Sequence, residues 1–191
     1  MTFTAPQNLH TPRLVVRLVS RDDLPALMRM NGDERVTRFL PYATWAVPAD
    51  GEAWFDRMDA AHATGTSLQF VIVERATSVA VGTSLLFRYE AGSARAELGY
   101  ALGRDCWGRG YMAEALAALI GHAFGPMGLR RLEAEVNPDN RASARLLEAL
   151  GFVNEGRRRM RWTAKGAPYD VSAYGLLKGE LVPSTARDQP A

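Results

Sequence analysis

The chain has 191 residues, of which 47% are hydrophobic and 23% charged, and its formal net charge is +2. This composition is typical of one globular domain with a substantial core, and so small a charge does not indicate nucleic-acid binding. The single cysteine, Cys106, excludes an internal disulfide. No apolar run approaches the roughly 18 residues of a membrane span, and the first residues lack a signal-peptide pattern. We therefore expect a cytoplasmic protein without a nucleic-acid or membrane partner.

The first half of the chain predicts a strand, two helices and three further strands. A loose leader over residues 1–11 precedes a β-rich strand at Arg13–Leu18. Ser20 and Asp23 form the pattern of a helix start, and Pro48 fits the first turn of a second helix. Three strand-like runs with short breaks then indicate an antiparallel meander. They are Leu68–Glu74, Ala80–Tyr89 and Ala94–Leu102.

The second half alternates helices and strands. Apolar residues recur at helical spacing in Tyr111–Phe124, and charged and apolar residues alternate in Arg131–Val136. A short helix is expected at Arg141–Leu150, where Asp139 or Asn140 can cap its start.

The C-terminal part predicts a hairpin of Arg157–Thr163 and Tyr169–Leu177, and the basic run at its start is interpreted as a solvated strand end. Residues 182–191 have the composition of a flexible tail. The expected order is β-α-α-β-β-β-α-β-α-β-β, an α/β domain of mixed sheet and helices over residues 12–181.

Two glycines separate a strand-like run from a helix-like run. Gly108 and Gly110 follow Ala96–Leu102 and open Tyr111–Phe124. Glycine permits close backbone approach, and a helix start carries unpaired N–H donors and a partial positive charge. The layout predicts a socket for a phosphate or pyrophosphate, although two glycines alone also make a tight turn. A dinucleotide-binding motif is disfavoured, because it requires a third glycine and a parallel βαβ pattern.

Four stretches, taken in order, carry a further pattern. They are Thr11-Pro12-Arg13-Leu14 with Val16-Arg17; Ala96-Glu97-Leu98-Gly99-Tyr100; Trp107-Gly108-Arg109-Gly110-Tyr111-Met112; and Asn137-Pro138-Asp139-Asn140-Arg141-Ala142-Ser143 with Leu150-Gly151-Phe152. Together they resemble the Gcn5-related N-acetyltransferase (GNAT) superfamily, within it the branch of bacterial ribosomal-protein alanine and serine N-acetyltransferases. The resemblance runs from about Thr11 to Gly179.

The resemblance implies a single domain with a mostly antiparallel sheet flanked by helices. A splayed pair of parallel strands, Ala94–Leu102 and Arg131–Val136, would form the acyl-CoA cleft. Acetyl-CoA would be the acetyl donor, and the reaction would require no metal. The residues implied to bind it are Tyr100, Ala101, Leu102, Trp107, Gly108, Arg109, Gly110, Tyr111, Met112, Ala113, Asn140, Ser143 and Arg145. Arg104 is an alternative to Arg145 for the 3′-phosphate.

The implied reaction is direct attack of a neutral amine on the thioester in a ternary complex. An α-amine has a pKa of about 8, so it needs only a modest base. Glu97 is the first candidate for that base, and it is equally readable as a structural acid on the sheet. Ser143 is the implied proton donor to the leaving thiolate, because Leu147 occupies the place where many members have a tyrosine. A first-turn serine can also bond the backbone instead.

Several other residues are weaker candidates for a role in the site or are interpreted as structural. Glu74 and Glu90 are weaker candidates for the base. His10 and His62 lack partners at metal-ligand spacing, and His122 falls off the apolar stripe of its helix and should face solvent. Trp45, Trp54 and Phe39 either line an acceptor pocket or, as aromatics at helical spacing more commonly do, belong to the core.

The acceptor is open at this level. The leading hypothesis is the N-terminal α-amine of a protein, such as a ribosomal protein. One alternative is a small amine, namely an amino acid, a polyamine or an aminoglycoside-type compound. Another is a non-catalytic acyl-CoA-binding or sensing module, which the joint presence of Glu97 and Ser143 disfavours. A homodimer is compatible with the sequence, which does not determine the oligomeric state.

Overall fold

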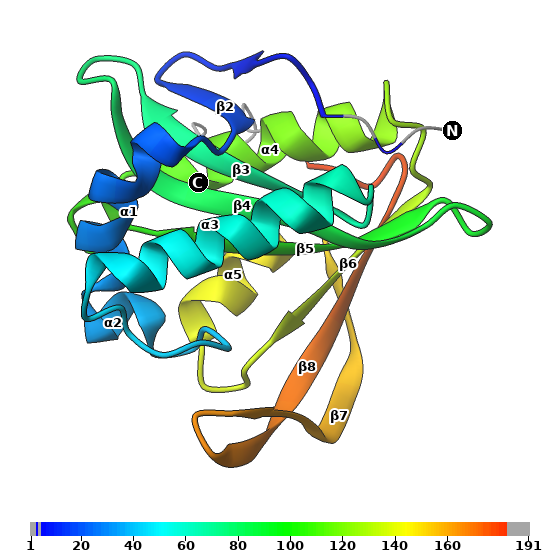
Figure 1. Cartoon of the computed structure of the whole chain (residues 1–191). Coiled ribbons are helices and arrows are strands. Elements are labelled where there is room, and N and C mark those ends of the chain that lie inside the picture. Colours follow the sequence, from blue (N-terminus) through cyan, green and yellow to red (C-terminus); the bar gives the residue numbers. More distant parts are fainter. Residues whose placement is uncertain (1–2, 4, 183–191) are drawn as a thin grey trace.

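The computed structural model describes residue 3 and residues 5–182, where one mixed sheet carries helices on both faces (Figure 1). The sheet order is β1-β2-β3-β4-β5-β6-β8-β7. Its strands are β1 (Leu9–His10), β2 (Leu14–Leu18), β3 (Ser67–Glu74), β4 (Val79–Glu90), β5 (Arg95–Leu102), β6 (Arg131–Val136), β7 (Val153–Ala164) and β8 (Ala167–Leu177). The helices are α1 (Leu24–Asn31), α2 (Glu34–Thr37), α3 (Pro48–Ala63), α4 (Tyr111–Phe124) and α5 (Arg141–Ala149).

Alternation along the strands divides the core between the two faces of the sheet. Phe70 and Ile72 of β3 point to the face covered by α4, where they join Leu116 and Leu119. Val71, one residue along, points to the other face and packs in the cluster that contains α1 and α3 residues. Because successive side chains of a strand point to opposite faces, both helical layers can pack their apolar sides against the same sheet.

The pairing of β5 with β6 is parallel, whereas every other neighbouring pair in the described sheet is antiparallel. It runs only from Arg95↔Arg131 to Glu97↔Glu133. Beyond that point β5 remains paired with β4 as far as Leu102, and β6 remains paired with β8 as far as Val136. The two strands therefore diverge while each keeps its outer neighbour, which confirms the splayed pair that the resemblance implied.

The N-terminal part contains two elements that the sequence pattern did not predict. Leu9–His10 pairs with Val15 and Val16, so this part of the expected loose leader is ordered. Glu34–Thr37 forms the single turn of α2. Elements this short contain no full hydrophobic period, and contacts with neighbouring segments hold them in place. The Ser20 helix start is confirmed: its N–H donates to Asp23 Oδ2 at 2.8 Å, and a 3₁₀ turn leads into α1.

The last hairpin is longer than predicted, because β7 already begins at Val153. Almost all of β7 is exposed, and its register with β8 shifts twice, so it lacks the alternation that marks a half-buried strand. Residues 183–191, most of the predicted tail, lie outside the described part of the chain, and the domain bounds 12–181 stay a prediction. None of the helices that the structure describes is long and apolar enough to cross a membrane.

Candidate active site

The glycine loop turns an open helix start toward solvent. Gly108 has a φ of +74° and Gly110 a φ of +72°, a left-handed conformation that a residue without a Cβ adopts readily. Gly110 is the N-cap of α4, and its carbonyl accepts the N–H of Glu114 at 3.1 Å. The N–H groups of the first turn have no acceptor within the helix. Residues 107–110 are exposed, so the predicted socket is accessible.

Arg13, just before β2, braces this loop. Its Nε donates to Glu114 Oε2 at 2.6 Å, its Nη1 donates to the carbonyl of Arg109 at 2.8 Å, and its guanidinium lies 4.6 Å from the centroid of the Tyr111 ring. From the other side, Trp107 Nε1 donates to the carbonyl of Leu102 at 2.8 Å. The loop is thereby tied to β2 and β5, which explains why the stretch around Arg13 accompanies the loop in the sequence pattern.

The Glu114 carboxylate is the centre of that brace. Burial acts to raise its pKa, but hydrogen bonds from Thr11 and from the Arg13 N–H and guanidinium outweigh this effect and hold the pKa below its usual value. Glu114 is therefore ionised at neutral pH next to a helix N-terminus, where a negative charge is favourable.

A pair of hydroxyls bridges β5 and α5. The hydroxyl of Tyr100 lies 2.6 Å from Ser143 Oγ, and Asn140 Oδ1 accepts the N–H of Ser143 at 3.2 Å. The predicted cap by Asn140 is thus confirmed. Burial raises the pKa of Tyr100, and the bond to Ser143 only partly offsets this, so the phenol stays protonated at neutral pH. Tyr100 was predicted as part of a cofactor-binding strand, and the contact of its hydroxyl with Ser143 was missed because only the fold brings α5 beside β5.

Glu97 lies on the opposite face of β5 from Tyr100, because the two positions differ by three, an odd number, and side chains alternate along a strand. It is 6% exposed, at the last paired position before the splay, and its Oε1 accepts from Arg88 Nη1 at 2.8 Å. Arg88 has a φ of +50° where the pairing of β4 with β5 shifts register. Both interpretations of Glu97 survive: it is ion-paired on the sheet, and it borders the divergent strands.

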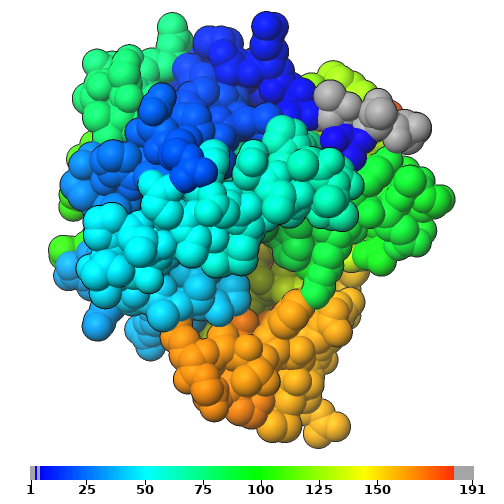
Figure 2. All heavy atoms as spheres, in the orientation of Figure 1, coloured from blue at the N-terminus to red at the C-terminus, as the bar shows by residue number. Residues whose placement is uncertain are grey.

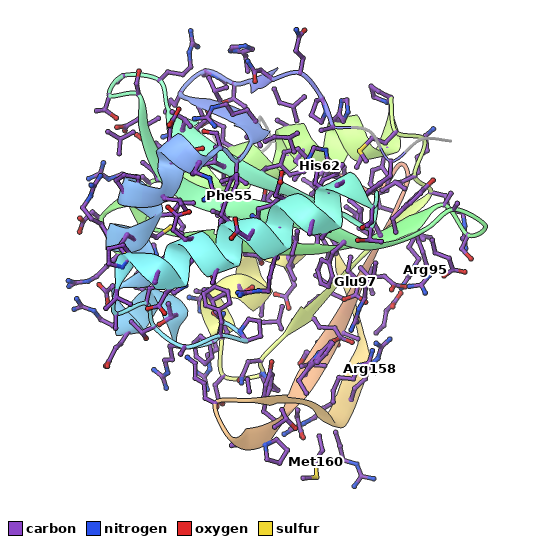
Figure 3. All side chains as sticks on the ribbon, viewed as in Figure 1. Phe55, His62, Arg95, Glu97, Arg158 and Met160 are labelled. Carbon is purple, nitrogen blue, oxygen red and sulfur yellow. The ribbon has the colours of Figure 1, made fainter. Side chains whose placement is uncertain are left out.

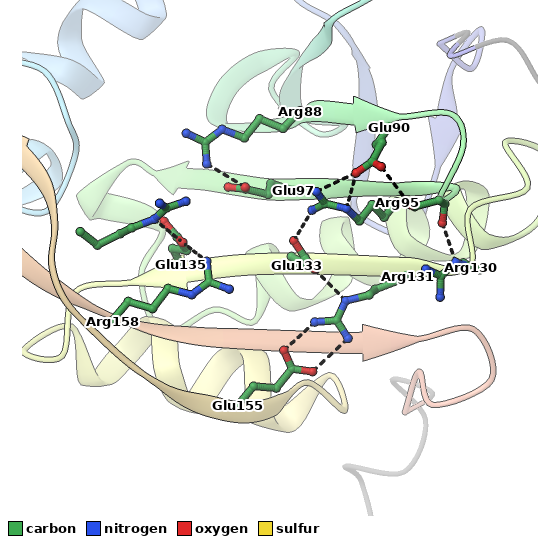
Figure 4. A network of polar contacts seen from close by, with 12 residues as sticks. Arg88, Glu90, Arg95, Glu97, Arg130, Arg131, Glu133, Glu135, Glu155 and Arg158 are labelled. Atoms are coloured by element: carbon green, nitrogen blue, oxygen red, sulfur yellow. Dashed lines mark hydrogen bonds and ion pairs between the residues drawn. The ribbon is translucent and has the colours of Figure 1, made fainter.

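A separate network of ion pairs crosses β5, β6 and β7 beside the Arg88–Glu97 pair (Figure 4). Arg95 Nη1 lies 2.7 Å from Glu133 Oε2, and Arg131 reaches both Glu133, at 2.8 Å, and Glu155, at 2.5 Å. Hydrogen bonds to Glu155 and Glu133 raise the pKa of Arg131 further above its ordinary value. These carboxylates are therefore already compensated by arginine.

The same face is hollowed between α3, the end of β4 and the β7–β8 hairpin (Figure 2). Glu97 and Arg158 lie on this side of the sheet (Figure 3). A small cavity there is lined by Glu97, Glu135, Arg158 and Tyr174, among others. At the hairpin tip, Lys165 Nζ donates to the carbonyl of Thr37 at 2.7 Å, which links the hairpin to α2.

The remaining candidates divide clearly. Trp45 and Trp54 are each 6% exposed and pack in the core, so for these two the core interpretation is confirmed. His122 is half-buried, and burial lowers its pKa, so it faces solvent only in part. Arg109 and Arg145 are exposed, and their cofactor contacts stay a prediction.

Two alternative carboxylates have other partners. Glu74 accepts hydrogen bonds from the hydroxyls of Tyr111 and Thr77, and Glu90 accepts from Ser93 and Arg95. Hydrogen bonding lowers the pKa of both groups, which makes them poorer proton acceptors.

Comparison with known proteins agrees with this geometry. The acetyltransferase (GNAT) domain model matches residues 13–153. The uncharacterized N-acetyltransferase p20 of Bacillus licheniformis is 32% identical over 174 residues, which cover 91% of this chain and 98% of the relative. The [ribosomal protein uS5]-alanine N-acetyltransferase of Escherichia coli is 31% identical over 155 residues, which cover 78% and 79% of the two chains.

Solved structures share the fold. RimJ of Mycobacterium smegmatis in complex with CoA-disulfide aligns with a TM-score of 0.77 at 22% identity, covering 92% of this chain and 84% of its own. Spermidine N-acetyltransferase of Vibrio cholerae, in complex with CoA and spermine, aligns with a TM-score of 0.77 at 18% identity, covering 89% and 98%. The chain belongs to the GNAT acetyltransferase family and is an acetyl-CoA-dependent N-acetyltransferase.

Proposed function

We propose that this enzyme acetylates the α-amine of a protein N-terminus by direct attack on acetyl-CoA bound between β5 and β6. The observation that carries the proposal is the arrangement around the splay, where a buried carboxylate and a hydroxyl pair flank the divergent strands on opposite faces. Similarity to the uS5-alanine enzyme of Escherichia coli supports a protein N-terminus as acceptor.

The glycine loop fits the pyrophosphate of acetyl-CoA. A Cβ placed on Gly108 would meet no atom within 4 Å, so the backbone is open to a ligand, and the N–H groups from Gly108 to Ala113 surround the start of α4. An anion is favoured there by both the unpaired donors and the helix dipole. Arg109 adds charge, and Arg104 or Arg145 is available for the 3′-phosphate. Asn140 Nδ2 and the edge of β5 at Tyr100–Leu102 would align the pantetheine.

Glu97 accepts the proton of the attacking amine, directly or through a water molecule. Bound acetyl-CoA supplies the acetyl group as a thioester, and a backbone N–H of Tyr100–Leu102 would stabilise the developing oxyanion. As the N–C bond forms and the C–S bond breaks, the Tyr100–Ser143 hydroxyl pair donates a proton toward the sulfur. Tyr100 can then share its proton with Ser143, because the two oxygens are within hydrogen-bond distance.

The charges of the hollow disfavour a polyamine as acceptor. Glu97, Glu133 and Glu135 all accept hydrogen bonds from arginine side chains, so a polycation would have to displace those partners. A protein N-terminus presents a single amine with a pKa of about 8, which a modest base can deprotonate at neutral pH.

The test measures CoA thiol release with acetyl-CoA and three acceptors: a peptide with a free N-terminus, the same peptide blocked at its N-terminus, and spermidine. We expect release with the free peptide alone. Preference for spermidine, or no release with any amine, would contradict the proposal. Glu97→Gln should lower kcat at least about tenfold with little change in acetyl-CoA affinity, because the base is removed and the loop is not.

A further inference from the structure

The guanidinium of Arg88 lies beside Glu97, the proposed base, and only some of its N–H donors have a partner there. One of its donors, Nη1, is taken by Glu97, and its side chain is 40% exposed. A guanidinium carries five N–H donors in a rigid fork, and its usual partner is a carboxylate held by two of them. Arg88 therefore keeps donors for a second anion within one hydrogen bond of the Glu97 carboxylate.

Trp162 holds that guanidinium in place. The Arg88 guanidinium lies 4.6 Å from the centroid of the Trp162 ring, and that of Arg161 lies 5.3 Å from it. The indole Nε1 donates to Glu135, which anchors the ring to β6. Stacking restrains the plane of a guanidinium and leaves its N–H edge available, so Arg88 is preorganised for a bidentate partner.

Around Trp162, the arginine side chains outnumber the carboxylates that they pair with. Arg158 Nη1 and Arg161 Nε both donate to Glu135 Oε1, at 2.6 and 3.1 Å. With Arg88 on Glu97, three arginines share two carboxylates, and all three arginines remain at least 40% exposed. We refer to Arg88, Arg158 and Arg161 as the arginine cluster.

We propose that the arginine cluster binds a carboxylate of the acceptor, so that preferred acceptors carry a carboxylate close to the reacting amine. This inference rests on the proposed function, because it uses Glu97 as the site of the amine. Arg88 Nη1 and Glu97 Oε1 are 2.8 Å apart, and each would add a hydrogen bond of about 3 Å to its ligand. The amine and the carboxylate are then separated by only a few bonds. An N-terminal aspartate or glutamate meets this condition, and so does a free amino acid.

The experiment compares kcat/KM for matched acceptors with acetyl-CoA as donor. Peptides that begin with Asp and with Asn differ only in the charge of the first side chain, and free aspartate tests the second source of the carboxylate. We expect the wild-type enzyme to prefer the Asp peptide over the Asn peptide at least about tenfold, the effect of one charge-assisted hydrogen bond. A preference for free aspartate over both peptides would support the carboxylate site and would overturn the protein N-terminus as the acceptor.

Arg88→Gln should bring the Asp-to-Asn ratio close to one. Using the ratio removes any general loss of activity that follows from disturbing Glu97. Arg88→Lys keeps the charge without the fork and should restore only part of the preference. Arg157→Gln is the matched control, since Arg157 is on the same hairpin but pairs with Asp170, and it should leave the ratio unchanged.

Equal kcat/KM for the Asp and Asn peptides would overturn the inference, and that comparison needs no variant to fold. An unchanged ratio in Arg88→Gln would overturn it as well. Both outcomes leave the proposed function intact, because the peptides are still acetylated. No thiol release with any peptide would instead overturn the proposed function, so the two failures are distinguishable.

Discussion

At the scale of single residues, the hydroxyl pair of Tyr100 and Ser143 is the feature with the most direct chemical consequence. The two oxygens are 2.6 Å apart and come from different elements, β5 and α5. Either hydroxyl could face the sulfur of the thioester, and the other would then supply its proton. Groups that act as such a unit give strongly non-additive effects when they are removed.

We therefore predict that Tyr100→Phe and Ser143→Ala each lower kcat about tenfold or more, and that the double variant is little worse than the slower single variant. Single-turnover measurements with saturating acetyl-CoA check this, and a thermal unfolding curve of each variant is the control for folding. Fully additive losses would show that the two hydroxyls act separately.

The raised pKa of Tyr100 leads to a second prediction at this scale. Because burial favours the neutral phenol, Tyr100 stays protonated beyond the ordinary tyrosine pKa of about 10. Deprotonation of Tyr100 should therefore cause no decline in kcat between about pH 9 and about pH 11, where an ordinary tyrosine would ionise. A pH profile of the wild type and of Tyr100→Phe measures this, and a decline in that range confined to the wild type would contradict the assignment.

At the scale of elements, the start of α4 depends on a left-handed glycine and on the Arg13 brace. A Cβ at Gly110 would stand 3.4 Å from Arg13 Nη2, in a backbone conformation that L-residues avoid. Gly121, in the same helix, has ordinary helical geometry, and nothing lies within 4 Å of its Cβ position. Gly110, the N-cap of α4, and Gly121, in the interior of α4, thus allow the effect of an added Cβ to be compared at two sites of one element.

Gly110→Ala should lower stability by about 1–2 kcal/mol and weaken CoA binding, because the residue must either strain or move the loop. Gly121→Ala should raise stability by about 0.5–1 kcal/mol and leave CoA binding unchanged, since glycine is a poor residue for a helix interior. Urea unfolding and CoA titration measure both effects. Equal CoA affinity in the two variants would show that the loop conformation is not required.

Glu114 gives the brace a pH dependence. Its folded pKa lies below the unfolded value of about 4.3, so it contributes stability above that value, and the contribution is lost as the pH falls through the folded pKa. Glu114→Gln should cost about 1–2 kcal/mol at pH 7, a moderate value because Arg13 is half-exposed. The difference from wild type should shrink between pH 5 and pH 3 in urea unfolding curves, and a constant difference would argue against this role.

At the scale of the whole molecule, the β7–β8 hairpin closes one side of the hollow by reaching α2. The link is the hydrogen bond from Lys165 Nζ to the carbonyl of Thr37, made by residues 128 positions apart. The glycine loop lies on β2, β5 and α4, outside this contact. Loosening the hairpin should therefore affect the acceptor and spare the donor.

Lys165→Gln should raise KM for the peptide acceptor several-fold and leave KM for acetyl-CoA unchanged. The only other lysine of the chain, the exposed Lys178, provides the control as Lys178→Gln. Steady-state kinetics with each substrate varied in turn measure the split. An equal rise in both KM values would show that the hairpin supports the fold as a whole instead of the acceptor side.

Much of this molecule follows from local pattern. Helical spacing in Tyr111–Phe124, alternation in Arg131–Val136 and the glycine pair between strand and helix are properties of neighbouring residues, and the structure contains each of these elements. The splay between β5 and β6 was expected from the resemblance alone. The strand β1 was missed because two residues are too few to show a hydrophobic pattern. The strand β7 was predicted too short because most of it is exposed and shows no alternation of buried and exposed residues.

The sequence by itself determined the fold family and the acetyl donor, and it predicted the loop that would hold the pyrophosphate, since all of these depend on contiguous motifs. Only the tertiary structure decided which distant side chains meet. It paired Tyr100 with Ser143, Glu97 with Arg88, and Arg88 with Trp162, residues that lie 43, 9 and 74 positions apart. Such pairs depend on the register shifts of β4 against β5 and of β7 against β8, and on the packing of α5 beside β5, and no local pattern encodes them.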